Sequence, residues 1–283
     1  MRIAVIGSRG QLGAAIVHEC APHHDVVPFD RAALDITDSE RIDEAIGRVT
    51  PDVIINCAAY NAVDAAEDHA VEALQANAFA VRSLARAAKT VGATLVHYSS
   101  DFVFDGKASQ PYVEDDQPNP LSVYAMSKML GEWFAADAPR WYVLRVESLF
   151  GRAPNGSPAK GSVAAIVKGL RAGETVRVFE DRTVTPTFVV DGARATRALI
   201  ERDAESGLYH CVNSGFCTWL ELAREAAAIL AVEGRLEAVR LDEVKFKAPR
   251  PAYCALSNQK LTSLGIVMPT WRDALSRYLA APA

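Results

Sequence analysis

The chain has 283 residues, half of them apolar and 23% charged, so it can bury a large core as one α/β domain or as a main domain with a smaller lobe. Its formal net charge of −5 offers no basic surface, and we expect no nucleic-acid partner. We also expect no membrane partner, because no apolar run approaches the ~18 residues of a spanning helix. The apolar start Met1–Ile6 is too short for a signal peptide, so a cytoplasmic protein is expected.

Cysteine and histidine spacing gives no sign of a disulfide framework or a metal site. The five cysteines are odd in number and form no CxxC pair, and the six histidines form no HExxH. We therefore predict no metal and expect buried, reduced thiols at Cys20, Cys57, Cys211, Cys217 and Cys254.

The chain opens with a strand, a glycine turn and a helix. Arg2–Ile6 is a short apolar run, Gly7–Gly13 carries glycines in a GxxGxxG spacing, and an Ala-rich helical stretch continues to about Cys20. Glycines permit a tight turn and let the backbone and the helix N-terminus approach a pyrophosphate. A dinucleotide site is the favoured interpretation, and a purely structural strand–helix turn is the alternative.

The second strand, Asp25–Phe29, ends at Asp30 and Arg31, about 20 residues after the glycines, where a ribose-reading carboxylate is expected. Asp30 would accept hydrogen bonds from a free 2′-hydroxyl, whereas Arg31, or Arg9 in the glycine loop, would pair with a 2′-phosphate. The sequence therefore leaves both NADH and NADPH open.

The following stretch continues the alternation of helix and strand. A helix is expected from Ser39, as its cap, to Val49, then a strand at Val53–Ile55. That strand ends near Ala58-Ala59-Tyr60, where small residues would let a ring or ribose pack against the backbone, although plain close packing has the same composition. A long helical region is predicted from Ala70 to about Val91.

Two further strands complete the first half. Thr94–Tyr98 ends at Ser99-Ser100-Asp101, an irregular loop spans 105–120, a helix carries Tyr124, and Trp141–Arg145 is strand-like. Regular alternation of strands and helices predicts an α/β fold with a Rossmann-type, doubly wound parallel sheet.

Beyond Gly151 the pattern loosens. We expect a loop over 152–161, helices at Ser162–Arg171 and Asp191–Arg202, and strands at Thr175–Phe179 and Gly207–Val212; two last helices are expected at Trp219–Ala231 and Trp271–Leu279. The resulting interpretation is an NAD(P)-binding domain over 1–150, to which 187–215 returns. Residues 151–186 and 216–283 would form a smaller, C-terminal substrate-binding lobe.

Tyr124 and Lys128 carry the clearest chemical signal. Residues four apart lie on one helix face, so the phenol and the ammonium can point into one cleft. An adjacent cation stabilises a phenolate and lowers the pKa of the phenol, and the Ser100 hydroxyl could hold a carbonyl oxygen beside it. Taken alone, a Tyr and a Lys at this spacing also occur as an ordinary exposed pair.

Together these stretches resemble the extended short-chain dehydrogenase/reductases, and within that group the chain is similar to dTDP-4-dehydrorhamnose reductases. The resemblance spans nearly the whole chain. It rests on Gly7–Gly13, Pro51–Tyr60 continuing through Ala62–Glu67, Ser99–Gly106, Asn119-Pro120 with Tyr124-x-x-x-Lys128, Asp181–Thr187, and Gly207–His210 with Thr218-Trp219.

The resemblance implies reduction of the 4-keto group of a nucleotide-activated deoxysugar by NADH or NADPH. Tyr124 would protonate the carbonyl oxygen, Lys128 would bind the nicotinamide ribose and lower the pKa of the phenol, and Ser100 would take the hydroxyl position. Asp101 would orient substrate or water, or serve as a cap. The implied cofactor residues are Gly7, Arg9, Gly10, Gln11, Leu12, Asp30, Arg31, Asp35, Ile36, Ala58, Ala59, Tyr60, Tyr124 and Lys128.

For the nucleotide-sugar substrate the resemblance points to Val63, Ser100, Phe102, Glu147 and Arg182. Arg145 and Arg250 would bind a diphosphate or else form ordinary ion pairs. One departure concerns the substrate: where these reductases carry Arg-Thr-Ser-Trp, this chain has Arg145-Val146-Glu147-Ser148, so an aromatic platform is missing and an acid is introduced.

Two alternatives share the fold. One is a sugar-nucleotide epimerase or dehydratase, which keeps NAD bound, and the short C-terminal section favours the reductase over it. The other is a non-catalytic regulatory subunit that binds NAD(P), which the presence of Ser100, Tyr124 and Lys128 disfavours. A homodimer through the Tyr124 helix is common among such relatives.

Overall fold

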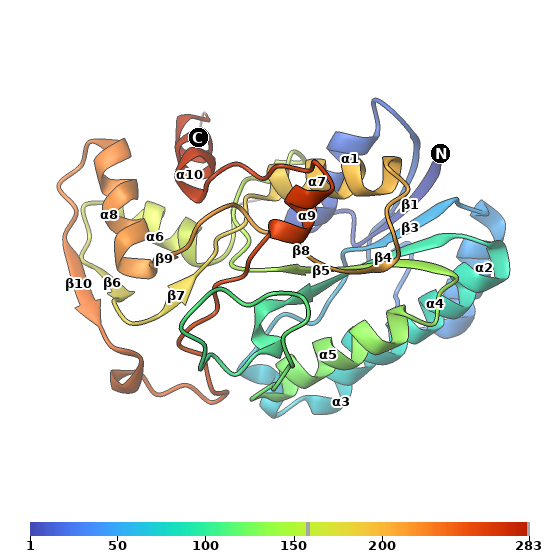
Figure 1. Ribbon diagram of the computed structural model, residues 1–283, viewed down its shortest axis with the longest axis horizontal. Helices are drawn as coiled ribbons and strands as arrows, with labels where there is room; N and C mark the ends of the chain where they lie inside the picture. The colour runs from blue at the N-terminus through green and yellow to red at the C-terminus, as the bar shows by residue number, and fades with distance from the viewer. Residues whose placement is uncertain (157–158, 282–283) are drawn as a thin grey trace.

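The computed structural model describes residues 1–156 and 159–281, so Ser157 and Pro158 of the expected loop over 152–161 lie outside the described residues. Its centre is a six-stranded parallel sheet with the strand order β2-β1-β3-β4-β5-β8 (Figure 1). The strands are β1 (Arg2–Ile6), β2 (Asp25–Phe29), β3 (Val53–Asn56), β4 (Thr94–Ser100), β5 (Arg140–Val146) and β8 (Gly207–His210).

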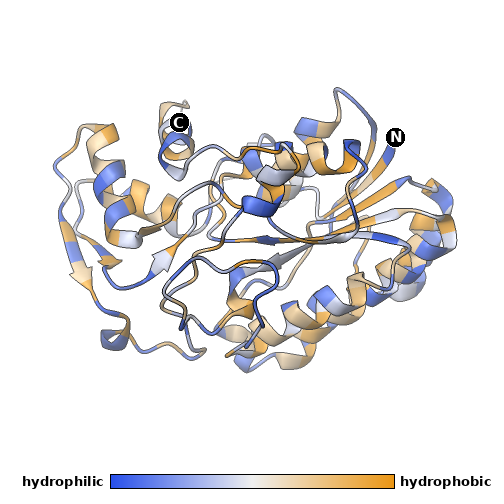
Figure 2. Ribbon diagram, in the orientation of Figure 1, coloured by the Kyte–Doolittle hydropathy of each residue, from blue (hydrophilic) through white to orange (hydrophobic). Residues whose placement is uncertain are grey.

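Helices cover both faces of this sheet. On one face lie α1 (Gln11–Cys20) and α7 (Val189–Glu201); on the other lie α2 (Ser39–Val49), α4 (Ala80–Val91) and α5 (Val123–Ala135). The strands are apolar along most of their length, as expected for a parallel sheet buried on both faces (Figure 2). The predicted doubly wound Rossmann-type fold is therefore confirmed.

The remaining elements form a smaller unit with its own core. Here α6 (Ser162–Arg171), α8 (Trp219–Leu230) and α10 (Trp271–Ala280) pack around Phe150, Trp219 and Trp271. Two short sheets accompany them: β6 (Val176–Phe179) with β10 (Leu236–Val239), and β7 (Thr183–Val184) with β9 (Cys217–Thr218). Figure 1 shows this unit at the end of the molecule away from β1 and β3.

Short helical segments complete the chain. They are η1 (Ala65–Glu67), α3 (Ala70–Leu74), η3 (Asp101–Val103), η4 (Leu241–Glu243) and α9 (Gln259–Ser263). The segment η2 (Gln75–Phe79) is a π-helical turn that joins α3 to α4, so the predicted helical region 70–91 is correct in extent but not uniform. None of the helices in the described ranges is long and apolar enough to cross a bilayer.

Three details differ from the sequence predictions. The cap of α2 is Asp38, whose carboxylate accepts from the main-chain N–H groups of Glu40 and Arg41, so Ser39 is the first helical residue instead. The strands β7, β9 and β10 and the helix α9 were not predicted. All five cysteines are free thiols, but Cys57 is only half-buried because it lies at the open end of β3.

Candidate active site

The glycine turn brings three backbone segments into close contact at the carboxyl edge of the sheet. Gly7 has a φ of 75°, and a Cβ there would lie 2.8 Å from the Ala58 nitrogen. A Cβ on Gly13, in the first turn of α1, would overlap the Gly7 carbonyl oxygen. The turn therefore requires glycine at both positions, and it leaves the N-terminus of α1 open to a ligand.

A cleft of about 680 Å³ runs from this turn across the ends of β1, β2 and β3. Within it Arg9 pairs with Asp30 at 2.9 Å, and Arg31 lies 3.7 Å from Asp35. Burial of Arg9 and Arg31 is slight, so both guanidinium groups are free to reorient toward an anion. The predicted cofactor residues that line this cleft are Gly7, Arg9, Gly10, Asp30, Arg31, Asp35, Ile36, Ala58, Ala59 and Tyr60.

A second cleft, of about 440 Å³, adjoins the first and shares Gly10, Ala58 and Ala59 with it. Strand β4 and helix α5 supply its polar groups. The predicted residues that line it are Gly10, Gln11, Leu12, Ala58, Ala59, Ser100, Asp101, Tyr124 and Lys128. The two clefts together therefore contain every residue predicted for the cofactor and for catalysis.

Tyr124 and Ser100 meet inside the second cleft. Burial raises the pKa of the phenol to about 12, and the neighbouring Ser100 hydroxyl acts in the opposite direction. The Ser100 Oγ donates to Asp101 Oδ1 at 2.8 Å and accepts from the Phe102 N–H at 3.2 Å. Ser100 thus caps η3 while facing the phenol.

Lys128 lies on the same face of α5 as Tyr124, as the spacing predicts, but its ammonium does not lower the phenol pKa as expected. The Nζ donates to the Tyr98 carbonyl oxygen at 2.5 Å. Burial lowers the pKa of Lys128 itself to about 8, while Glu132 and Cys57 act in the opposite direction. The phenol pKa is controlled by burial, Ser100 and Asp101, and Lys128 is not among these causes.

Asn77, which the sequence did not single out, holds the two walls of the cleft together. Its side chain accepts from the Tyr60 N–H at 2.8 Å, and its amide donates to the Tyr60 carbonyl at 3.0 Å and to Ser127 Oγ at 2.9 Å. The π-helical turn η2 carries this fully buried residue. Such turns occur often at functional sites, but no local sequence signal marks this one.

The residues predicted for the substrate fall into two groups. Val63 and Phe102 pack against Tyr124, and the Arg182 guanidinium lies 5.3 Å from the Phe102 ring centre. Glu147 instead is buried beneath the site, where its Oε2 accepts from the Thr185 N–H at 2.6 Å. Burial raises the pKa of Glu147 well above its usual range.

Of the two arginines left open, Arg145 forms an internal ion pair. Its guanidinium makes two 2.8 Å hydrogen bonds to the Glu132 carboxylate on α5, and both side chains are buried. It is therefore not directed toward a substrate. Arg250 pairs with Asp64 at 2.7 Å and lies 5.8 Å from the Phe102 ring centre, near Arg182.

Other residues that line the second cleft escaped prediction. They include Asn61 after β3, Ser148 and Leu149 after β5, and Lys160 in the loop before α6. The position of a residue at the carboxyl end of a predicted strand could have indicated Ser148 and Leu149. Lys160 lies in a Gly/Pro/Ala-rich stretch that carries no positional signal.

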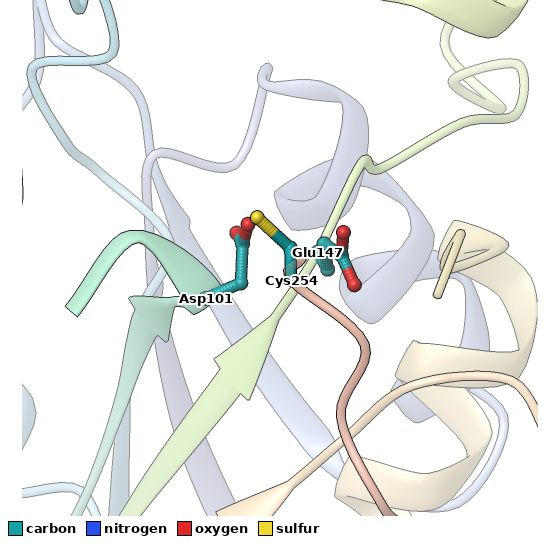
Figure 3. A group of neighbouring side chains, drawn as sticks. All are labelled: Asp101, Glu147 and Cys254. Carbon is teal, nitrogen blue, oxygen red and sulfur yellow. The ribbon is translucent and has the colours of Figure 1, made fainter. Parts of the chain in front are cut away.

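Asp101, Glu147 and Cys254 form a buried group of donors behind Ser100 (Figure 3). Their donor atoms lie within 4.8 Å of one another. We assign no metal here, because the Arg182 cation acts on both carboxylates, and because burial raises the pKa of the Cys254 thiol, which disfavours the thiolate a metal requires.

Known proteins resemble this chain over its full length. The sequence profile described as the RmlD substrate binding domain matches residues 1–283. A dTDP-4-dehydrorhamnose reductase of Burkholderia thailandensis is 35% identical over 295 residues, covering 97% of each chain. The spore coat polysaccharide biosynthesis protein SpsK of Bacillus subtilis is 31% identical, covering 98% of this chain and 96% of that protein.

A solved structure also resembles this chain over nearly its whole length. The dTDP-4-dehydrorhamnose reductase of Bacillus anthracis, crystallised with NADP, superposes with a TM-score of 0.92 at 31% identity and covers 98% of both chains. The sequence profile includes both the glycine turn and the second lobe. The chain therefore belongs to the family of the RmlD substrate binding domain.

Proposed function

We propose that this protein is an NAD(P)H-dependent oxidoreductase that reduces the 4-keto group of a dTDP-linked deoxysugar. The observation that carries the proposal is the meeting of Ser100, Tyr124 and Lys128 in a cleft that continues the one formed by the glycine turn. The family's dTDP-4-dehydrorhamnose reductases, one of them crystallised with NADP, support both the substrate class and the cofactor.

The residues present suit a nicotinamide dinucleotide. Gly7 and Gly13 let the backbone of the turn pack tightly against Ala58 and the first turn of α1. This packing leaves the N-terminus of α1 to offer main-chain N–H groups to a pyrophosphate. Asp30 would hold the adenosine ribose, with Arg9 and Arg31 placed for a 2′-phosphate. When bound, the cofactor supplies the hydride.

The protein would supply the proton and the alignment. Tyr124, protonated because burial raises its pKa to about 12, donates its proton to the carbonyl oxygen as that oxygen gains charge. Ser100 hydrogen-bonds the same oxygen and keeps the carbonyl next to the phenol. Lys128, anchored on the Tyr98 carbonyl, would place a positive charge near the nicotinamide ribose.

For the nucleotide sugar we propose that the C-terminal lobe, residues 151–186 and 216–283, closes the site over the domain of 1–150 and 187–215. Arg182 and Arg250 both lie near the Phe102 ring and would provide guanidinium groups for the diphosphate. Val63 and Phe102 would give the sugar an apolar wall in place of the missing tryptophan.

We further propose a cytoplasmic homodimer that associates through α3, η2 and α5. These elements expose large apolar side chains that a second copy would cover, and Trp133 is 68% exposed. The other members of this apolar surface are Val71, Phe79 and Met126. Sedimentation of wild-type protein and Trp133→Glu would test the dimer, with a monomeric variant as the expected result.

The function is tested by incubating the purified protein with dTDP-4-keto-6-deoxy sugars and NADH or NADPH in separate reactions. We expect nucleotide-dependent formation of the 4-hydroxy sugar, one product per nicotinamide oxidised. An absorbance spectrum of the protein as purified separates the alternatives, because an epimerase or dehydratase keeps its NAD bound. Failure to bind either nucleotide would contradict the proposal.

A further inference from the structure

The parallel sheet places two acids side by side behind the Ser100 hydroxyl. Ser100 on β4 pairs with Val146 on β5, so the next register position sets Asp101 against Glu147. Both side chains are buried, with 3% and 1% of their surfaces exposed. Figure 3 shows them on either side of Cys254, and one carboxylate oxygen of each lies within 4.8 Å of the other.

Each of these acids has one hydrogen-bonded oxygen and one without a partner. Asp101 Oδ1 accepts from Ser100, and Glu147 Oε2 accepts from the Thr185 N–H. Among the described residues no nitrogen or oxygen atom bonds Asp101 Oδ2 or Glu147 Oε1, and the neighbour of the Asp101 carboxylate on this side is the Cys254 thiol. Two buried carboxylates at this separation, each with an unpartnered oxygen, cannot both remain ionised, so the pair retains a proton.

That proton determines what the Ser100 hydroxyl can do. The Ser100 hydroxyl has one proton to donate and two acceptor positions. The Phe102 N–H occupies one of these acceptor positions. When Asp101 is ionised, Ser100 donates to it and has no proton left for a substrate. When Asp101 is protonated, it donates to Ser100, which then directs its own proton toward Tyr124 and a carbonyl oxygen.

We propose that Asp101 and Glu147 form an acid pair that holds one proton at neutral pH, and that Glu147 is a positioning residue that acts through Asp101 on the direction of the Ser100 hydroxyl. This proposal rests on the reductase function above. No proton leaves the pair during reduction, because the proton delivered to the product oxygen comes from Tyr124. The pair keeps Ser100 in its donating orientation while Asp101 carries the shared proton; when the proton lies on Glu147, Ser100 donates to Asp101 instead.

The groups that face the pair are consistent with a retained proton. Burial is the largest influence and raises the pKa of both acids, whereas the Arg182 cation acts in the opposite direction. Tyr124, Tyr253, Cys217 and Cys254 also face it, and all four have raised pKa values that keep them neutral. Among the described residues, Arg182 is the cation with the largest effect on the pair.

The test compares pH profiles of kcat for wild type, Glu147→Gln and the double variant D101N/E147Q. Glutamine still accepts from the Thr185 N–H, but it leaves Asp101 free to ionise beside Arg182. We expect Glu147→Gln to lower kcat about tenfold at neutral pH, with an alkaline limb moved to lower pH and an unchanged KM for NADPH. In D101N/E147Q the Asn amide donates to Ser100 permanently, so the wild-type profile should return.

The control is Glu114→Gln, since burial raises the pKa of Glu114 too, but its carboxylate accepts from the His210 N–H, away from Ser100. It should leave the profile unchanged. A wild-type profile in Glu147→Gln, or a loss that D101N/E147Q does not restore, would overturn the proposal.

An infrared measurement separates this proposal from the reductase function. Wild-type protein at neutral pH should show the C=O stretch of a protonated carboxyl group. This band should be absent from Glu147→Gln. It should remain in Glu114→Gln, where only the contribution of Glu114 itself changes. If the protein turned over the keto-sugar but wild type and Glu147→Gln had the same carboxyl C=O band, the acid pair would be refuted. If the carboxyl band differed between wild type and Glu147→Gln but no keto-sugar were reduced, the result would support the acid pair and refute the reductase function.

Discussion

Lys128 Nζ donates a 2.5 Å hydrogen bond to the main-chain carbonyl of Tyr98, which fixes helix α5 against strand β4. Tyr98 lies two residues before Ser100, and Tyr124 lies one helical turn before Lys128. This bond therefore sets the position of the phenol opposite the Ser100 hydroxyl. The same bond satisfies one proton of an ammonium that burial otherwise destabilises.

The lysine should give the enzyme an alkaline limit. Because the pKa of Lys128 is about 8 while that of Tyr124 is about 12, we expect kcat/KM to fall as pH rises above about 8, with the phenol still protonated. Lys128→Arg keeps a permanent charge, so its residual activity should lack this limb. The same limb in wild type and Lys128→Arg would assign it to another group.

Replacement of this lysine should also stabilise the fold. The pKa of Lys128 is lowered from 10.5 to about 8, so below pH 8 the folded state carries an ammonium that the unfolded chain solvates better. The penalty, about 3 kcal/mol, is fully present below pH 8 and disappears as the pH rises to 10.5. Lys128→Met should therefore be inactive yet more stable at pH 7, by about 1–3 kcal/mol in urea unfolding, since the lost hydrogen bond offsets part of the gain.

For the buried ion pair of Arg145 and Glu132, we expect that loss of one partner lowers the stability of the fold. Glu132→Gln leaves the guanidinium without its counter-charge in the core and should destabilise the protein by about 3–5 kcal/mol. Glu132→Leu combined with Arg145→Met removes both charges and should lose less. If the double variant were as unstable as the single one, packing rather than charge would explain the loss.

The glycine turn can be tested without any substrate. Gly13→Ala would bring its Cβ against the Gly7 carbonyl, so we expect NADPH binding, followed by fluorescence titration, to weaken at least about tenfold. Gly47→Ala in α2 has no atom within 4 Å of its new Cβ and should bind normally, with up to ~1 kcal/mol of added stability. Normal binding by Gly13→Ala would show that the turn shifts to accept a side chain.

The sequence predicted these features because their signals are local. Strand–helix alternation, glycines at Gly7 and Gly13, and the four-residue spacing from Tyr124 to Lys128 each depend on a few neighbouring residues. The predicted strands of the central sheet accordingly match the structure within two residues at each end.

What the sequence did not reveal depends on residues far apart in the chain. Tyr124 is buried by Ala66, Val63 and Phe102, and this burial raises the pKa of the phenol. No local sequence pattern indicates these contacts. Asn77 meets Ser127 across 50 positions, and Arg145 meets Glu132 only because β5 lies beside α5. Such contacts follow from the packing of the whole fold.

The most direct measurement is the oxidation of NADPH by wild type and Tyr124→Phe in the presence of a dTDP-4-keto-6-deoxy sugar. The phenylalanine ring keeps the packing against Phe102 and removes only the hydroxyl. We predict a fall in kcat of about 10²–10⁴-fold, with NADPH affinity unchanged. Reduction at the wild-type rate by Tyr124→Phe would contradict the account, because the proton would then have to come from another group.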